Sequence, residues 1–278
     1  MNFDKTDIEV SIIIINYNTF SLTCNCIQSV IECTSGIIYE IILVDNNSSE
    51  CSADLFFEKF PNIKLVKSGS NLGFSKGNNL GILQAEGNYV LLLNSDTELT
   101  ENSIKIIYDF INTNEKAAVA SPALIFPNGN YQSVCQRFPS IRYQLFELLR
   151  LQKLLPKTKA GKVLLGSFFD HTKNIKSDWV WGTCFMFKRK LLQRLPDSKL
   201  NEFFFMYFED MQWCKDFKKL GYEIHYCSQT KVIHHMGGSF GKKTEFLNQN
   251  YQVFMKNNYN FIHRYFIVTI NKLLEITQ

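Results

Sequence analysis

The 278-residue sequence has no apolar run that approaches the ~20 residues of a membrane-spanning helix. Its first residues, MNFDKTDIEV, are polar and acidic, so they resemble neither a signal peptide nor a membrane anchor. The eight cysteines form no Cys-x-x-Cys pair and no spacing typical of a zinc site. We therefore expect a cytoplasmic protein with reduced cysteines, because disulfides persist mainly in oxidising compartments.

The sequence also lacks a strong charge of either sign. A formal net charge of +4 is mild and gives no indication of nucleic-acid binding. Hydrophobic residues make up 45% and charged residues 20% of the chain, which is ordinary for a soluble globular protein. The length allows one large or two small domains, and 24 phenylalanines predict a large aromatic core or apolar surfaces that contact partners.

Two common nucleotide-binding motifs are missing, since no GxGxxG follows the first strand-like segment and no GxxxxGK[ST] occurs. The segment NLGFSKGNNLGI (71–82) instead has glycines at intervals of four residues. This spacing is typical of a turn followed by a closely packed helix. The neighbouring amides of Asn71, Asn78 and Asn79 favour contacts with a ligand, and the pattern alone leaves both interpretations open.

The first half of the chain alternates strand-like and helix-like segments. We expect helices after Asn18 and Thr19, from near Phe74, and after an N-cap at Thr100 with Glu101 in its first turn. The apolar segments between them predict strands within 10–17, 39–49, 62–69 and 87–96. This alternation predicts βαβ units with right-handed crossovers and a mainly parallel sheet.

The second half is less regular. A hairpin is predicted around residues 127–130, and the segment 141–176 is basic and helical in character. A strand leading into a helix is predicted within 178–192, a helix that ends at Gly221 within 208–222, and short strands after it. No repeat or linker is visible, so a single domain is expected.

Three of the four predicted strands of the first half end in clusters of small polar residues. These clusters are Asn16-Tyr17-Asn18, Asp45-Asn46-Asn47-Ser48 and Asn94-Ser95-Asp96. One such ending is typical of a solvent-exposed turn. Because ligands bind beyond the carboxyl ends of parallel strands, three endings of this kind predict a binding site.

Asp96 has two interpretations. It is either an acid in a turn before a helix or a ligand for a hard divalent cation, which prefers oxygen donors. His234 or His235 in HHMGGS would supply a second ligand, although a histidine pair more often has only structural contacts. One carboxylate and one imidazole suit Mg²⁺ or Mn²⁺ and leave positions for phosphate oxygens.

Glu209 and Asp210 follow the aromatic segment FFFMYF (203–208). Two acids at the start of a helix interact favourably with its dipole, which is the simpler explanation. Partial desolvation among the aromatic residues would instead raise the pKa of an acid and suit it to proton abstraction. Spacing does not decide between these roles.

Together these motifs resemble the inverting nucleotide-sugar glycosyltransferases of family 2, and most closely their rhamnosyltransferase-like branch. The matching segments occur in the family's order: SIIIINYN, VDNNSS, NLGFSKGNN, LLLNSDTE, WGTCFMFKR, FEDMQWC and the HxxGxS of His234, Gly237 and Ser239. The resemblance covers nearly the whole chain except its C-terminal tail.

The resemblance implies the GT-A fold, an α/β fold with a Rossmann-like, mostly parallel sheet, flanking helices and an elaborated acceptor side. It implies one domain over 1–278, made of a nucleotide-binding half (about 8–116), an acceptor and catalytic half (117–240) and a helical tail (241–278). Asp210 would be the catalytic base, with Glu209 ordering the acceptor, while Asp96 and His234 would bind Mg²⁺ or Mn²⁺. The donor pocket would comprise Asn16, Tyr17, Asn18, Asp45, Asn71, Gly73, Asn78, Asn94, Ser95, Trp181 and Gly182.

Two positions depart from the family pattern. Asn94-Ser95-Asp96 carries one carboxylate where the family's DxD element has two, and Gln212 stands where another acid often follows the Glu-Asp pair. The first departure weakens the case for tight metal binding without donor. The second lies at a position that is usually supportive, so an active enzyme is still expected.

The implied activity is transfer of a sugar from a nucleoside-diphosphate donor to a saccharide or lipid-linked acceptor in bacterial surface polysaccharide synthesis. dTDP-rhamnose is the favoured donor and a UDP-hexose the second choice. The basic segment 141–176 is either a solvated surface or in contact with anionic lipid. The tail 257–276 either packs on the core or docks at the cytoplasmic face of the inner membrane. The sequence does not indicate an oligomeric state.

Two other functions compete with this one. A sugar nucleotidyltransferase would have a glycine-rich basic loop near its N-terminus, but IINYNTFSLTCNC has no Lys, Arg or Gly. A non-catalytic nucleotide-sugar-binding module is the second, and the presence of Asp96, Asp210 and His234 argues against it.

Overall fold

The computed structural model describes residues 7–236 and 243–277. Its strands are β1 (Val10–Asn16), β2 (Tyr39–Asp45), β3 (Lys64–Lys67), β4 (Tyr89–Asn94), β5 (Thr97–Leu99), β6 (Ala117–Ile125), β7 (Cys135–Gln136), β8 (Ile175–Ser177), β9 (Trp179–Val180), β10 (Cys184–Lys188) and β11 (Glu223–His234). Its α-helices are α1 (Phe20–Cys33), α2 (Asp54–Lys59), α3 (Gly73–Ile82), α4 (Ser103–Asn112), α5 (Ile141–Leu148), α6 (Lys157–Leu164), α7 (Glu209–Lys219), α8 (Lys243–Asn258) and α9 (Phe261–Thr277). Short 3-10 helices are η1 (Leu151–Leu154), η2 (Gly166–Phe168), η3 (Arg189–Arg194) and η4 (Pro196–Ser198).

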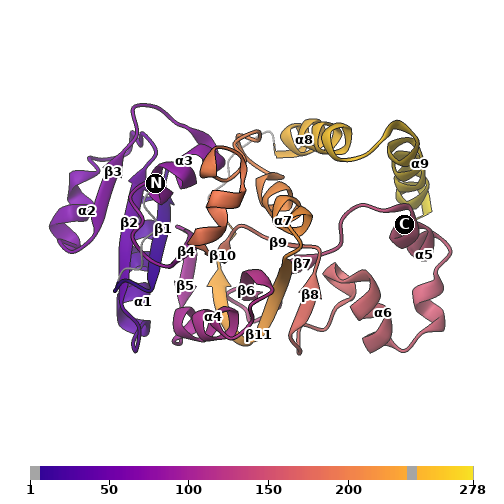
Figure 1. Ribbon diagram of the computed structural model, residues 1–278, viewed down its shortest axis with the longest axis horizontal. Coiled ribbons are helices and arrows are strands. Elements are labelled where there is room, and N and C mark those ends of the chain that lie inside the picture. Colours follow the sequence, from indigo (N-terminus) through magenta and orange to yellow (C-terminus); the bar gives the residue numbers. More distant parts are fainter. Residues whose placement is uncertain (1–6, 237–242, 278) are drawn as a thin grey trace.

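The first half of the chain forms the predicted parallel sheet, in the order β3-β2-β1-β4 (Figure 1). Ile12, Ile13 and Ile14 of β1 are completely buried, as expected for a strand covered on both faces. The register places Asn16 opposite Asp45, and Asn94 opposite the residue that precedes Asn16. The three polar strand endings therefore lie along one edge of the sheet.

The second half extends this sheet with strands of both directions. β10 lies antiparallel between β4 and β6, and β11 is parallel to β6 and antiparallel to β5. The segment after Gly221 was expected to form short strands, which is wrong. It forms the single 12-residue strand β11, with irregular pairing between Cys227 and Lys231 where the strand passes from one part of β6 to the next.

The predicted N-cap at Thr100 is also wrong, because α4 begins at Ser103. Glu101 has another partner: its carboxylate accepts hydrogen bonds from the Thr230 hydroxyl at 2.7 Å and from the Lys231 backbone N–H at 2.8 Å. A long-range contact with β11 thus replaces the expected interaction with the helix dipole.

The predicted hairpin around residues 127–130 forms only in part. Phe126 and Asn130 close the turn through backbone hydrogen bonds, and Ile125 and Tyr131 form an isolated antiparallel bridge. β6 pairs chiefly with β10 and β11 instead. All eight cysteines are free, as the composition predicted.

The helical segments of the second half gather at one end of the molecule. Figure 1 shows α5, α6 and α9 at the end opposite α2 and β3, with α8 between α7 and α9. A second hydrophobic cluster joins Phe204 and Met211 to Phe254 and Met255 of α8 and Ile267 of α9. Within residues 7–236 and 243–277, no helix is long and apolar enough to cross a membrane.

Candidate active site

The ends of β1 and β2 are joined by a buried hydrogen-bond network. The Asn16 amide nitrogen donates to Asp45 Oδ1 at 2.9 Å and to the Ser48 hydroxyl at 2.8 Å. The other Asp45 oxygen, Oδ2, accepts from the Ser48 backbone N–H at 3.2 Å. Asn16 and Asp45 are 1% and 6% exposed, so they are held rigidly at the predicted donor edge.

A second amide, which the sequence reasoning did not select, ties this edge to the glycine-rich segment. Asn46 donates to Asn71 Oδ1 at 3.0 Å and accepts from the Leu72 backbone N–H at 2.9 Å. Asn71 Oδ1 also accepts from the Gly73 N–H at 3.0 Å. The run of polar residues from Asp45 to Ser48 contained the signal, because Asn46 follows directly on the predicted site residue Asp45.

The remaining residues of this edge are less uniform. Tyr17 is 44% exposed, and Asn18 Oδ1 accepts from the Ser49 N–H at 2.7 Å, so both lie at the surface next to the network. Asn78 is buried and donates to the Phe74 carbonyl of its own helix at 3.0 Å. Its amide is therefore committed to α3, in agreement with the packing interpretation of the glycine-rich segment.

The end of β4 carries a polar atom with unused hydrogen-bonding capacity. Among the described residues, Asn94 Oδ1 is buried and has no hydrogen-bond partner. The Asn94 N–H donates to the Thr183 carbonyl at 2.9 Å, next to the predicted site residues Trp181 and Gly182. The Ser95 hydroxyl lies 3.2 Å from that of Thr19. A buried acceptor of this kind is suited to a donor group on a ligand.

Asp96 and His234 come together across the sheet. β5 and β11 pair so that His234 lies opposite Thr97, and the His235 backbone N–H donates to the Asp96 carbonyl at 2.9 Å. His234 Nε2 lies 3.4 Å from Asp96 Oδ1, and both side chains are largely buried. His235 points to the other face of the strand, where its Nε2 lies 3.2 Å from Glu98 Oε2. The geometry therefore favours His234 as the metal ligand.

Gln132 fixes the orientation of the His234 ring, and sequence reasoning missed it. Its amide nitrogen donates to the His234 carbonyl at 2.8 Å, which turns Oε1 towards His234 Nδ1, also at 2.8 Å. An oxygen can only accept there, so Nδ1 donates to Gln132 and Nε2 is the ring nitrogen that faces Asp96. Such an outer hydrogen bond is typical of histidines that bind metals.

The pair fits a divalent cation. Two atoms 3.4 Å apart can both reach one ion at bond lengths of about 2.1 Å. The described residues contain no group of three or more His, Cys, Asp or Glu side chains that could hold a metal. The protein would thus supply two donors and leave other positions to diphosphate oxygens and water, as Mg²⁺ and Mn²⁺ sites commonly do. Gly237 and Ser239, the rest of the HxxGxS motif, lie outside the described residues.

Asp210 lies at the start of α7, facing the segment after β9. Its Oδ2 accepts from the Gly182 backbone N–H at 2.9 Å, and its Oδ1 accepts from the Met211 N–H at 2.7 Å. Gly182 packs closely, since an added Cβ would lie 3.2 Å from the Phe74 ring and 3.4 Å from Asp210 Cβ, and the Phe74 ring would have to shift slightly to admit it. The Thr183 carbonyl accepts from Asn94 at the end of β4, and the Gly182 N–H donates to Asp210. The segment 182–183 therefore links the predicted donor pocket to the predicted catalytic base.

The two acids have different surroundings. Burial raises the pKa of Asp210 to about 6. Burial, and then the neighbouring Asp210 charge, raise the pKa of Glu209 well above its ordinary range. Glu209 is 7% exposed, and its Oε2 has no hydrogen-bond partner among the described residues. Glu209 therefore holds its proton more tightly than Asp210 does, and Asp210 is the member of the pair that ionises more readily.

The aromatic segment before α7 is strained and tightly held. Tyr207 and Phe208 have φ values of 68° and 74°, which bulky residues rarely adopt. The Asn250 amide of α8 donates to the carbonyls of Met206 and Tyr207 at 2.7 and 3.1 Å. Strain of this kind persists only where neighbouring contacts over-determine the backbone, so α8 positions the start of α7.

The same segment also packs on the glycine-rich turn. Gly73 has a φ of 74°, and a Cβ there would lie 2.4 Å from the Phe205 carbonyl oxygen. The Phe74 N–H donates to that oxygen at 2.7 Å, and the Ser75 hydroxyl donates to the Phe204 carbonyl at 2.8 Å. Gly73 thus joins the donor edge to the loop that carries Asp210. Gln212, where an acid was expected, bonds Asp216 and Asn258 and supports the contact of α7 with α8.

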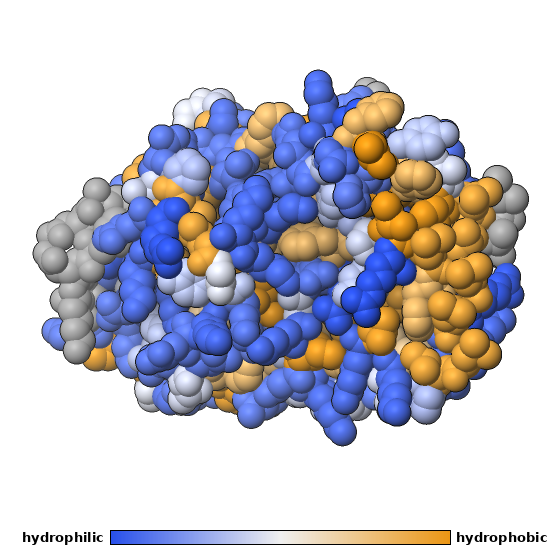
Figure 2. All heavy atoms as spheres, turned by 45° about the vertical axis from the view of Figure 1, so that its right-hand side comes forward, coloured by the Kyte–Doolittle hydropathy of each residue, from blue (hydrophilic) through white to orange (hydrophobic). Residues whose placement is uncertain are grey.

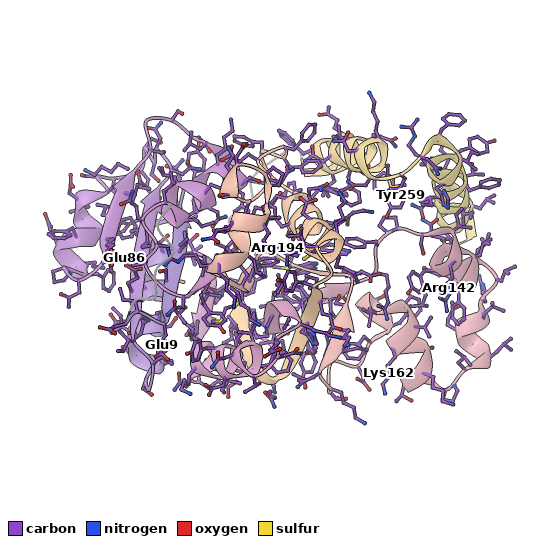
Figure 3. All side chains as sticks on the ribbon, in the orientation of Figure 1. Glu9, Glu86, Arg142, Lys162, Arg194 and Tyr259 are labelled. Atoms are coloured by element: carbon purple, nitrogen blue, oxygen red, sulfur yellow. The ribbon has the colours of Figure 1, made fainter. Side chains whose placement is uncertain are left out.

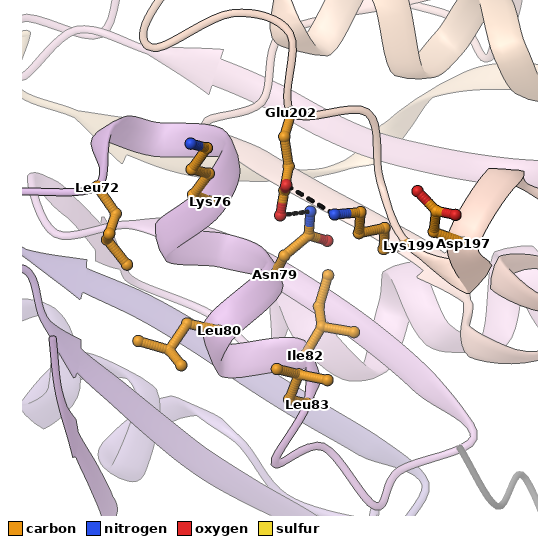
Figure 4. A pocket seen from close by; sticks show the side chains of 9 residues that line it. All are labelled: Leu72, Lys76, Asn79, Leu80, Ile82, Leu83, Asp197, Lys199 and Glu202. Atoms are coloured by element: carbon orange, nitrogen blue, oxygen red, sulfur yellow. Dashed lines mark hydrogen bonds and ion pairs between the residues drawn. The ribbon is translucent and has the colours of Figure 1, made fainter.

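A separate surface pocket lies on the outer side of α3. It has a volume of about 290 Å³ and contains Leu72, Lys76, Asn79, Leu80, Ile82, Leu83, Asp197, Lys199 and Glu202 (Figure 4). Glu202 pairs with Lys199 at 2.8 Å and with the Asn79 amide at 3.0 Å. Asn79, whose amide was expected to favour contacts with a ligand, lines this pocket, but the side chains of Asn79, Lys199 and Glu202 already satisfy one another.

A sequence comparison identifies the family of this chain. The sequence model described as Glycosyl transferase family 2 matches residues 11–196, more than half of the chain. The chain belongs to glycosyl transferase family 2. The family prediction made from the motifs is thereby confirmed.

Relatives of this family 2 glycosyltransferase include two proteins whose names state an activity. The low-salt glycan biosynthesis hexosyltransferase Agl10 of Haloferax volcanii is 28% identical over 264 residues, which cover 91% of this chain and 75% of the relative. The N-acetylglucosaminyl-diphospho-decaprenol L-rhamnosyltransferase of Mycobacterium tuberculosis is 22% identical over 214 residues, which cover 73% and 68%.

Solved structures show the same fold. The crystal structure of GalNAc-T7 with UDP, GalNAc and Mn²⁺ has a TM-score of 0.64 and 16% identity, covering 88% of this chain and 48% of that chain. Staphylococcus aureus TarS 1–349 has a TM-score of 0.57 and 16% identity, covering 90% and 74%. This family 2 glycosyltransferase therefore has the GT-A fold, as the resemblance implied.

Proposed function

We propose that this protein is an inverting glycosyltransferase that moves a sugar from a nucleoside-diphosphate donor to a hydroxyl of a saccharide or lipid-linked saccharide. The observation that carries the proposal is the position of Asp96 and His234 at the donor edge of the sheet, linked through residues 182–183 to Asp210. One side of the site thus has a cation-binding pair, and the other has a carboxylate that can accept a proton.

In the proposed reaction, Asp210 takes the proton of the acceptor hydroxyl while that oxygen attacks the anomeric carbon opposite the leaving diphosphate. The carbon–oxygen bond to the diphosphate breaks as the new bond forms, so the anomeric configuration inverts. Glu209, the neighbouring acid, would orient the acceptor. Asn16, Asp45 and Asn71 hold the nucleoside side of the pocket, and Asn94 Oδ1 is placed to accept from a donor hydroxyl.

Asp96 and His234 would hold Mg²⁺ or Mn²⁺, which would neutralise the charge that develops on the leaving diphosphate. The crystal structure of GalNAc-T7, which shares this fold, holds UDP together with Mn²⁺ and supports this cofactor class by analogy. Gln132 would hold the His234 ring with Nε2 directed at this position.

The names of the relatives support a role in glycan synthesis. A hexosyltransferase of glycan biosynthesis and a rhamnosyltransferase that acts on a diphospho-decaprenol sugar both match most of the chain. We infer bacterial surface polysaccharide synthesis, such as that of O-antigen, at the cytoplasmic side of the membrane. dTDP-rhamnose is the first donor to test and UDP-hexose the second. The division at residues 116 and 240 into donor half, acceptor half and tail remains part of the proposal.

A thermal-shift panel tests donor binding directly. We expect dTDP, UDP or GDP to raise the unfolding temperature in the presence of Mn²⁺, and a chelator to remove most of the rise. A ligand at ~100 times its dissociation constant adds about 2.7 kcal/mol to the free energy of unfolding, which such an assay resolves. A rise with dTDP alone would favour rhamnose, and a rise with UDP alone would favour UDP-hexoses.

The same panel also tests the alternatives. If no nucleotide shifts the unfolding temperature of a folded sample, the donor site is wrong. If nucleotide binds but neither sugar transfer nor donor hydrolysis occurs with a range of sugars, the protein would be a nucleotide-sugar-binding module instead.

The pH dependence of transfer should follow Asp210. The base acts only when it is ionised, and burial has raised its pKa to about 6. We therefore expect kcat/KM, measured at saturating metal, to fall below about pH 6 and to stay level above it. An acid limb near 3.8, the ordinary value for an aspartate, would contradict the assignment of Asp210 as the base.

A further inference from the structure

The end of the molecule formed by α5, η1 and α9 exposes an unusually apolar surface. In Figure 2 hydrophobic side chains gather on this side, with hydrophilic ones around them. Phe261, Ile262 and Tyr265 at the start of α9 are 71%, 64% and 60% exposed. We call this surface the α5–α9 patch, and it comprises Leu145, Leu149, Leu154, Leu155, Phe261, Ile262, Tyr265, Phe266 and Leu273.

α9 is firmly attached to the rest of the protein, so loose packing is not the reason for these exposed side chains. Its opposite face is packed, with Ile267 completely buried and Ile270 6% exposed. The Asn271 amide donates to the Tyr251 hydroxyl at 2.9 Å and accepts from the Gln144 amide of α5 at 2.5 Å. Apolar side chains therefore lie on the outer face of α9 as well as on its packed face, beside the charged residues Arg264 and Lys272. The outer face is expected to have a partner.

The basic residues beside the patch indicate what kind of partner it binds. Between residues 141 and 164 the chain has one acid, Glu147, and six basic residues that are all exposed: Arg142, Arg150, Lys153, Lys157, Lys159 and Lys162. Figure 3 places Arg142 on α5 and Lys162 on α6, at this same end of the molecule. Arg264 and Lys272 add further positive charge on α9.

We propose that the α5–α9 patch docks this protein on an anionic lipid surface. Aromatic and aliphatic side chains beside lysines and arginines are the composition of helices that lie in the membrane interface. A second copy of the chain fits less well, because a two-fold contact through this surface would bring the basic residues of both copies together. Anionic headgroups would neutralise the same residues.

Docking would have a consequence for the active site. Ile267 of α9 belongs to the hydrophobic cluster that contains Phe204, from the aromatic segment before Glu209, and Met211, which follows Asp210. This cluster, which also contains Phe254 and Met255 of α8, connects the docked helix with the start of α7. A lipid-linked acceptor would be held at that same surface, and this point alone rests on the proposed function.

Sedimentation of the full chain with vesicles tests the proposal. We expect binding to vesicles of phosphatidylcholine with phosphatidylglycerol at low salt, weaker binding to phosphatidylcholine alone, and release as salt is raised. The double variant Ile262→Ser/Phe266→Ser should lose binding, and Lys153→Glu/Lys157→Glu should weaken it by about tenfold or more, because each basic residue near such a surface contributes about 1 kcal/mol. The matched control Ile38→Ser/Phe57→Ser changes residues of similar exposure, 56% and 52%, and should bind like the wild type.

Three results would overturn the proposal. The first is no binding of the wild type to anionic vesicles at low salt, and the second is an equal loss of vesicle binding in the Ile38→Ser/Phe57→Ser control. The third is a wild-type dimer that the Ile262→Ser/Phe266→Ser variant converts to monomers, which would show that a second copy covers the patch. The nucleotide thermal shift should be the same in the wild type and in the patch variants. If vesicles bind while every nucleotide fails, the proposed function falls and the docking surface stands.

Discussion

Replacing Asp210 by asparagine should reduce the rate of sugar transfer by about 10²–10⁴-fold, the contribution that a general base typically makes. Asparagine has nearly the same shape and can still accept the hydrogen bond from the Gly182 N–H, but it cannot take a proton. The measurement is kcat with saturating donor and acceptor, together with the nucleotide-dependent thermal shift. The shift should remain, because Asp210 lies outside the proposed diphosphate site.

Stability provides a control for this variant. Burial raises the folded-state pKa of Asp210 above its unfolded value, so the folded protein gains stability from the protonated group at low pH and loses it as pH rises through about 6. Asparagine does not ionise, so Asp210→Asn removes this loss of stability at higher pH. We expect the variant to unfold at a temperature equal to or above that of the wild type at pH 8, with a smaller difference at pH 5.

Asp216 offers a matched control on the same helix. It is also partly buried with a raised pKa, and it bonds Gln212 and Lys219 rather than the site. Asp216→Asn should keep most of the transfer rate. Comparable losses in both variants would indicate a general effect on α7, and an active Asp210→Asn enzyme would show that another group is the base.

Replacing Asp96 by alanine is expected to lower the transfer rate by about 10²–10³-fold, the loss seen when one electrostatic stabiliser of a transition state is removed. The carboxylate is one of two protein donors for the proposed cation, and its loss leaves only His234. The apparent affinity for Mn²⁺, measured by titrating the metal in the transfer assay, should weaken at the same time. His234→Ala should weaken it as well, with the nucleotide thermal shift reduced in both variants.

The neighbouring pair of Glu98 and His235 is the matched control. Glu98 lies two positions after Asp96, and His235 lies one position after His234. Glu98 Oε2 and His235 Nε2 are 3.2 Å apart and face away from the site. Glu98→Ala and His235→Ala should leave the metal titration unchanged. If they weaken it as much as Asp96→Ala does, the cation lies elsewhere or its binding depends on general surface charge.

The parallel half of the fold could be predicted because its signals are local. β1, β2 and β4 are continuous apolar runs that each end in a polar cluster, and their pairing follows from the βαβ rule. β10 could not be placed between β4 and β6, and β5 could not be paired with β11, because strand order depends on contacts between distant segments. The error at Thr100 has the same origin, since Glu101 bonds β11.

The candidate site shows a similar limit. From the residues alone Asp96 and Asp210 kept simpler explanations, a turn acid and an acid at a helix start, and the family resemblance is what selected them for the site. Sequence could not choose between His234 and His235, whereas the strand can, because successive residues point to opposite faces and only His234 faces Asp96. Gln132 could not be found at all, since one glutamine in a loop carries no pattern.

The pairing of β5 with β11 also determines at which stage of synthesis the proposed cation site can form. During synthesis Asn16, Asp45 and Asp96 emerge from the ribosome early, but His234 lies at the end of β11 and emerges only after most of the chain has been made. A nascent chain can therefore form the nucleoside edge of the pocket before it has both cation ligands. The proposed cation site would therefore be completed only when β11 pairs with β5.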